Sequence, residues 1–190
     1  MKVIAFLGSP RKEGNSEILL RETTRGIKEN GHEVILFRPS EMNISPCLNC
    51  GGCDTTGQCV IEDDMDKIYE AIRQGDRFVL VSPIFFFGLP AQIKAPIDRC
   101  QIFFCEKYFL KKSIPPGPYG RKGLLVLVGG MKREIGYKCG EATTTAFFRT
   151  ISVPEHRTVQ FPGVDATGEI RKHPTALKEV YEAGLQLVSS

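Results

Sequence analysis

Short apolar runs alternate with longer stretches of helical periodicity along this chain. Five runs rich in Val, Ile, Leu and Phe predict strands at residues 3–7, 33–37, 77–81, 123–128 and 157–161. Stretches with the apolar spacing of helices cover residues 16–29, 64–74, 90–104, 141–151 and 174–188. Strands that alternate with helices are typical of a parallel sheet with helices on both faces. The pattern therefore predicts an α/β, doubly wound fold with a five-stranded parallel sheet.

Length and local signals predict one domain. Asn30 and Gly31 are suited to end the first helix, and Pro90 is suited to the first turn of the third. The Pro- and Gly-rich residues 114–120 interrupt the pattern, but the chain after them is too short for an ordinary second domain. We expect residues 1–190 to form a single domain, with a cysteine-rich insertion at about residues 43–61.

Composition excludes several classes of protein. The formal net charge is only +3, and the chain lacks the dense basic stripe of a nucleic-acid-binding protein. No apolar run approaches the ~20 residues that cross a bilayer, and the apolar start is too short for a signal peptide. We therefore expect a cytoplasmic protein that binds neither nucleic acid nor membrane.

The strongest chemical signal is a compact cysteine motif with the spacing C-x2-C-x2-C-x5-C. Its members are Cys47, Cys50, Cys53 and Cys59. Three closely spaced cysteines before a fourth are typical of [4Fe-4S] sites, and the interspersed glycines permit positive φ and close approach of backbone N–H groups to sulfur. The motif therefore favours an iron-sulfur cluster.

Two other uses of these cysteines remain open. All-cysteine sites also bind zinc, although usually through two C-x2-C pairs that a longer stretch separates. A loop without metal is the second alternative; disulfides are not expected where no secretory signal precedes the domain.

The loop after the first predicted strand has the composition of a phosphate site. Residues 8–16 combine glycine, hydroxyl, amide and cationic side chains, and they end where a helix begins. A helix N-terminus offers free N–H groups and the positive end of a dipole, and Arg11 adds charge. The loop matches neither the Walker A nor the G-x-G-x-x-G pattern. An ordinary capped turn is the alternative.

The loop after the third predicted strand is expected beside it, because ligands of doubly wound sheets bind at the carboxyl ends of the strands where the strand order reverses. Residues 82–90 place three consecutive phenylalanines between turn-forming ends, so a flat ring system can rest on this segment. Successive side chains alternate in direction, and we expect at least one of the three to pack inward.

With these motifs the chain resembles the iron-sulfur flavoproteins of the flavodoxin-like, NAD(P)H-dependent FMN reductase superfamily. The resemblance spans almost the whole chain and rests on residues 8–16, on the four cysteines, and on residues 82–99. It implies the strand order 2-1-3-4-5 and the cofactor FMN. It further implies that Ser9, Arg11, Asn15 and Ser16 hold the phosphate, that Pro83, Ile84, Phe85, Phe86, Phe87 and Gly88 edge the isoalloxazine, and that Gly129 and Gly130 close its other side.

The resemblance also implies a [4Fe-4S] cluster on Cys47, Cys50, Cys53 and Cys59, and a homodimer or homotetramer in which cluster and flavin of neighbouring subunits approach each other. The expected function is electron transfer between cluster and FMN, coupling one-electron carriers such as ferredoxin to two-electron acceptors, with no catalytic side chain. A cluster-free NAD(P)H-dependent FMN or quinone reductase is the alternative, and a flavin- or metal-sensing module without turnover is a third reading.

The remaining candidates receive structural roles. Cys100, Cys105 and Cys139 are expected to be small buried hydrophobic residues. The acidic residues 62–64 are expected to cap the following helix. A basic group is expected to form a solvated face, with steering of an acidic electron carrier as the minority reading; it comprises Lys107, Lys111, Lys112, Arg121 and Lys122.

Overall fold

The computed structural model describes residues 1–189 of the chain. Its centre is one sheet of five strands: β1 (Lys2–Leu7), β2 (Glu33–Phe37), β3 (Arg77–Pro83), β4 (Lys122–Gly129) and β5 (Glu155–Pro162). All neighbouring strands pair in parallel, in the order β2-β1-β3-β4-β5. The predicted α/β fold and the strand order 2-1-3-4-5 are therefore confirmed.

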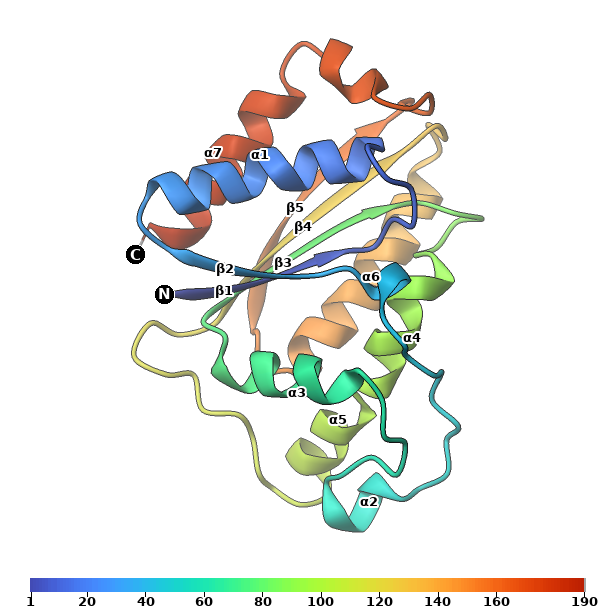
Figure 1. The fold of residues 1–190 in the computed structure, drawn as a ribbon, viewed down its shortest axis with the longest axis vertical. Helices are drawn as coiled ribbons and strands as arrows, with labels where there is room; N and C mark the ends of the chain where they lie inside the picture. Colours follow the sequence, from blue (N-terminus) through green and yellow to red (C-terminus); the bar gives the residue numbers. More distant parts are fainter. Residues whose placement is uncertain (190) are drawn as a thin grey trace.

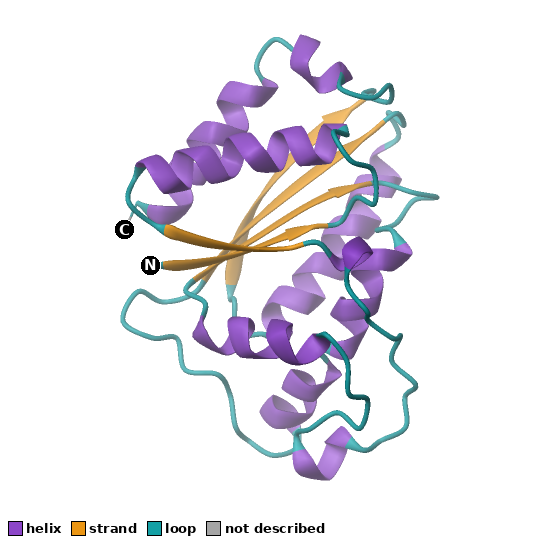
Figure 2. Cartoon of the chain, viewed as in Figure 1, coloured by secondary structure: helices purple, strands orange, loops and turns teal. Residues whose placement is uncertain are grey.

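Helices cover both faces of the sheet (Figures 1 and 2). One face carries α1 (Asn15–Glu29) and α7 (Ala176–Val188), and the other carries α3 (Met65–Gln74), α4 (Ala91–Arg99), α5 (Gln101–Tyr108) and α6 (Glu134–Thr150). The strand side chains alternate between these two cores. Val3 and Ala5 of β1 join the core under α1 and α7, whereas Ile4 and Phe6 join the opposite one.

Two helices differ from their predicted bounds. The helix predicted at residues 90–104 is split at Cys100, because the Tyr69 hydroxyl donates to the carbonyl of Arg99 (3.0 Å) and the Phe103 amide bonds the Cys100 carbonyl instead (3.0 Å). Helix α6 begins at Glu134 rather than near residue 141. Gly136 and Gly140 lower the helix propensity of its first turns. A Cβ at either position would lie 3.1 Å from Ile84, so the lack of a side chain there lets α6 pack closely against the residue that follows β3.

Three short elements complete the chain: η1 (Pro39–Glu41), η2 (Glu169–Lys172) and α2 (Cys53–Thr56). Helix α2 lies within residues 47–59, which we call the cysteine segment. Among residues 1–189, no helix has the length and apolarity of a membrane span. The start of β1 and the end of α7 lie at one edge of the sheet, and the loops after β1 and β3 lie at the other (Figure 1).

Candidate functional site

The carboxyl ends of β1, β3, β4 and β5 meet around one cavity of about 130 Å³. It is lined by Ser9, Arg11, Gly14, Asn15, Ser16, Pro83, Ile84, Phe85, Val128, Gly129, Gly130, Val164 and Asp165. Nine residues predicted to bind FMN are thus brought together, while Phe86, Phe87 and Gly88 lie outside the lining. The sequence reasoning missed Val128, Val164 and Asp165. The rule that ligands bind at the carboxyl ends of such strands would have pointed to the loop after β5.

The N-terminus of α1 faces this cavity without a side-chain cap. Gly14 occupies the N-cap position and no side chain there accepts a hydrogen bond from the first turn. The buried Ser9 orients the loop, since its Oγ accepts from the Arg11 amide (3.2 Å). The free N–H groups of the first turn, the Ser16 hydroxyl and the Arg11 charge form a donor set that fits a phosphate group.

The Asn15 side chain links the start of α1 to the segment after β5. The carboxamide Nδ2 donates to the carbonyl of Ala166 (3.0 Å), and Oδ1 accepts from the amide of Ile170 (3.2 Å). Both ends of the carboxamide are therefore engaged with the segment after β5. Asn15 positions that segment over the cavity, and its backbone N–H remains part of the helix terminus.

The segment after β3 forms a small hairpin. The amide of Phe85 donates to the carbonyl of Gly88 and the reverse bond has the same length, 2.9 Å. Phe86 and Phe87 form the turn with φ of 46° and 65°, the left-handed region that phenylalanine rarely adopts. Phe85, Phe86 and Phe87 are 46%, 103% and 39% exposed. The expectation that one of them packs inward is wrong, because the turn lifts all three off the core.

The end of β4 is fixed by three donors. The Gly129 carbonyl accepts from the amides of Gly163 (2.8 Å) and Val164 (3.1 Å), and from the hydroxyl of the buried Tyr137 (3.0 Å). Burial raises the pKa of Tyr137, which keeps this hydroxyl a proton donor. The end of β4 is therefore tied both to the segment after β5 and to α6.

The four motif cysteines line a second, smaller cavity together with Arg99 and Gln101. None of them is fully buried and none is in a disulfide. The amide of Asn49 lies 3.5 Å from Cys47 Sγ, a contact of the kind that tunes cluster sulfurs. Positive φ occurs at Asn49, Gly51 and Gly57 but not at Gly52, where φ is −59°. Four sulfur donors line one cavity, on a loop that turns at residues with positive φ. This donor set fits an iron-sulfur cluster.

The other cysteines differ from one another. Cys100 and Cys105 are buried as expected, but Cys139 is exposed, which the prediction missed because it stands on the outer face of α6. Cys105 is also not an isolated hydrophobic residue. Its Sγ lies 3.6 Å from Cys53 Sγ and donates to the carboxylate of Asp54 (3.1 Å), and burial raises its pKa to about 12. The helix that carries Cys105 therefore contacts the cysteine segment directly.

The acidic residues after Cys59 do more than cap. Asp63 accepts from the amide of Met65 (3.0 Å), the first residue of α3, whereas Asp64 occupies the N-cap position without a side-chain cap. The Asp63 carboxylate also pairs with the buried Arg99. Sequence reasoning missed this pair because the partners lie on separate elements. The predicted basic face is corrected at one position: Arg121 is buried, stacks on Phe78 and donates to the Ile72 carbonyl (2.6 Å).

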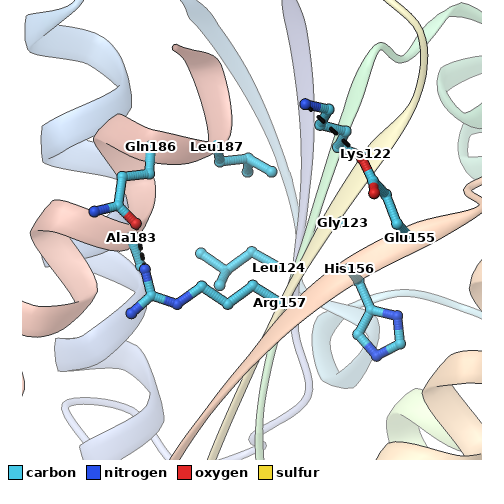
Figure 3. A pocket seen from close by; sticks show the side chains of 9 residues that line it. All are labelled: Lys122, Gly123, Leu124, Glu155, His156, Arg157, Ala183, Gln186 and Leu187. Carbon is cyan, nitrogen blue, oxygen red and sulfur yellow. Dashed lines mark hydrogen bonds and ion pairs between the residues drawn. The ribbon is translucent and has the colours of Figure 1, made fainter. Parts of the chain in front are cut away.

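A cavity of about 280 Å³ lies at the opposite edge of the sheet (Figure 3). Arg157 of β5 hydrogen-bonds Gln186 of α7, Lys122 pairs with Glu155 (3.8 Å), and His156 points away from the Arg157–Gln186 pair. No predicted site residue lines this cavity. Although it is larger than the cavity at α1, it lies at the amino ends of β4 and β5, where sheets of this kind do not bind their ligands.

The strand order β2-β1-β3-β4-β5, with a cavity at the carboxyl ends of the strands and an uncapped helix terminus beside it, defines a flavodoxin-like fold. Residues 1–158 match the family model described as NADPH-dependent FMN reductase, so the chain belongs to that family of oxidoreductases. This confirms the resemblance seen in the sequence.

Curated relatives carry the name iron-sulfur flavoprotein. One from Methanocaldococcus jannaschii is 40% identical over 52% of this chain and 51% of its own length, and one from Methanosarcina thermophila is 34% identical over 70% and 65%. The chain thus spans about half to two thirds of the length of these relatives. Among solved structures, an NAD(P)H:quinone oxidoreductase from Methanothermobacter marburgensis superposes with a TM-score of 0.77 at 20% identity, covering 100% of this chain and 98% of the other. This likeness concerns the fold.

Proposed function

We propose that the chain transfers electrons between a [4Fe-4S] cluster and FMN. Cys47, Cys50, Cys53 and Cys59 hold the cluster in this proposal, and the cavity at the N-terminus of α1 holds FMN. FMN accepts two electrons and releases them singly, whereas a cluster carries one, so the pair links one-electron carriers such as ferredoxin to two-electron acceptors. The protein binds, orients and tunes the two groups; no side chain takes part as acid, base or nucleophile.

One observation carries the proposal: all four cysteines of the compact motif line a single cavity as free thiols. The name iron-sulfur flavoprotein, which the curated relatives share, supports a cluster in this chain. Zinc remains the competing metal, and metal analysis separates the two.

The two cavities share no lining residue. Helix α2 lies at one end of the molecule, well apart from the loops after β1 and β3 (Figure 1). We therefore infer that electrons pass between neighbouring subunits of a homodimer or homotetramer, in which one chain's cysteine segment approaches another chain's flavin.

A second candidate is direct reduction of FMN or a quinone by NAD(P)H without a cluster. The description of the matching family favours it. In that case NADPH alone bleaches the flavin rapidly under anaerobic conditions, at a rate that does not depend on iron content.

The decisive experiment is anaerobic purification followed by iron, acid-labile sulfide, zinc and FMN counts per chain. The proposal expects about four iron and four sulfide per chain. Cys50→Ser should lose iron and keep FMN, while Cys139→Ser, which changes an exposed cysteine outside both cavities, should keep both. Yellow protein without iron after reconstitution would exclude the cluster and leave the reductase candidate.

A further inference from the structure

Three ligand atoms of Cys53, Asp54 and Cys105 converge at the contact between α2 and α5. All lie within 4.8 Å of one another. Cys53 Sγ and Cys105 Sγ are 3.6 Å apart, and Cys105 Sγ is 3.1 Å from Asp54 Oδ1. In a tetrahedral zinc site with bonds of about 2.3 Å, neighbouring sulfur ligands are about 3.8 Å apart. The two sulfurs therefore already stand near the spacing that one metal ion requires.

The contact that holds these donors together is tight. Helix α2 ends at Gly57, which has φ of 70°, and a Cβ at this position would lie 3.0 Å from Glu106 of α5. Gln101, one turn before Cys105 on the same helix, directs its carboxamide Nε2 toward Cys105 Sγ (3.7 Å). Cys105 is buried, whereas Asp54 is exposed and open to an incoming ion.

We propose that Cys53, Asp54 and Cys105 form a second metal site, for one thiophilic divalent cation of the Zn²⁺ class. Two thiols and a carboxylate supply three ligands, and a fourth position stays open to water. Binding releases the two thiol protons to solvent, with no change in oxidation state. Because Cys53 also belongs to the four-cysteine motif, occupation of this site and of the cluster site exclude each other; this last point alone rests on the proposed function.

Substitution of Cys105 distinguishes the proposed Cys53/Asp54/Cys105 site from the cluster site, because Cys105 does not belong to the four-cysteine motif. In a Cys47→Ser/Cys50→Ser background, which removes half of the cluster ligands, anaerobic titration with Co²⁺ should show one equivalent bound with thiolate-to-cobalt absorption and intense tetrahedral bands. Adding Cys105→Ser should abolish the thiolate band, whereas adding Cys139→Ser should leave it unchanged. Competition with Zn²⁺ then gives the affinity for zinc.

Two results would overturn the proposal: a double variant that binds no Co²⁺, or a thiolate band that survives Cys105→Ser. If Cys105→Ser fails to fold by circular dichroism, Asp54→Ala decides instead. Loss of a group that only hydrogen-bonds a metal ligand weakens metal binding about 10- to 100-fold. Loss of Asp54, itself a ligand in this proposal, should therefore weaken Co²⁺ binding at least about tenfold. A wild-type chain that never accumulates iron and sulfide would refute the proposed function and leave the cobalt result unaffected.

Discussion

The Arg99 guanidinium and the Asp63 carboxylate form a bidentate ion pair, with Nη1–Oδ2 at 2.7 Å and Nη2–Oδ1 at 3.2 Å. The two side chains are 1% and 2% exposed. Arg99 also donates to the carbonyls of Ser45 (2.9 Å) and Ile61 (3.1 Å), which lie on either side of the cysteine segment. One buried pair thus ties both ends of that segment to α4.

Asp63→Asn should destabilise the chain strongly, because it leaves the Arg99 charge buried and unpaired. Breaking such a pair typically costs about 3–5 kcal/mol, measurable as the free energy of unfolding in urea. The matched control is Asp98→Asn, which removes a half-exposed pair with Lys94; pairs of that kind contribute about 1 kcal/mol or less. Equal effects of the two variants would contradict the role of the buried pair.

The same pair predicts a pH dependence. Burial would raise the pKa of Asp63, but hydrogen bonds from Arg99 and from the amides of Ser45 and Met65 outweigh it and hold the pKa below its ordinary value. The stabilisation is therefore complete above the unfolded-state pKa of about 3.9 and is lost as the pH falls through the folded-state pKa. The stability difference between wild type and Asp63→Asn should be constant near neutral pH and shrink below about pH 4. A difference that grows on acidification would refute this sign.

Ser16→Ala should weaken FMN binding. A hydrogen bond to a charged group contributes about 1.5–3 kcal/mol, which corresponds to roughly a 10- to 100-fold rise in Kd. Quenching of flavin fluorescence gives the affinity. Ser113→Ala, in an exposed loop away from the cavity, is the control and should leave Kd unchanged. If the two variants bind FMN equally, the Ser16 hydroxyl makes no contact with the phosphate.

Substitutions in the hairpin turn after β3 should raise the stability of the chain. Phe86 and Phe87 both adopt positive φ, and two-residue turns of this geometry favour Asn-Gly. Strain of this kind costs about 1–3 kcal/mol per residue, so Phe86→Asn with Phe87→Gly should raise the free energy of unfolding by about 1 kcal/mol or more. Tyr119→Asn removes an exposed aromatic ring from a residue without positive φ and should give no such gain.

The sheet was predictable because its strands carry their own signal. The central strands β1, β3 and β4 are buried, continuous apolar runs, and all five strands fall within a few residues of their predicted bounds. Part of the α1 cavity was predictable for a related reason, since the loops after β1 and β3 leave from the same edge of a parallel sheet. Gly129 and Gly130 were expected from the family resemblance alone.

What the sequence left undetermined depends on contacts between distant segments. The break at Cys100 follows from a hydrogen bond of Tyr69, thirty positions away, and the approach of Cys105 to Cys53 spans 52 positions. The phenylalanine turn was misjudged for another reason: period-two alternation applies to extended backbone, and the left-handed φ of Phe86 and Phe87 reverses the chain instead.

The placement of the start of β1 and the end of α7 at one edge of the sheet has a practical consequence. A fusion partner or a surface linker attached at either place would sit on the side away from the loops after β1 and β3 (Figure 1). An immobilised chain would therefore present the cavity at the N-terminus of α1 to the solution, which suits surface-based measurements of how soluble ligands bind there.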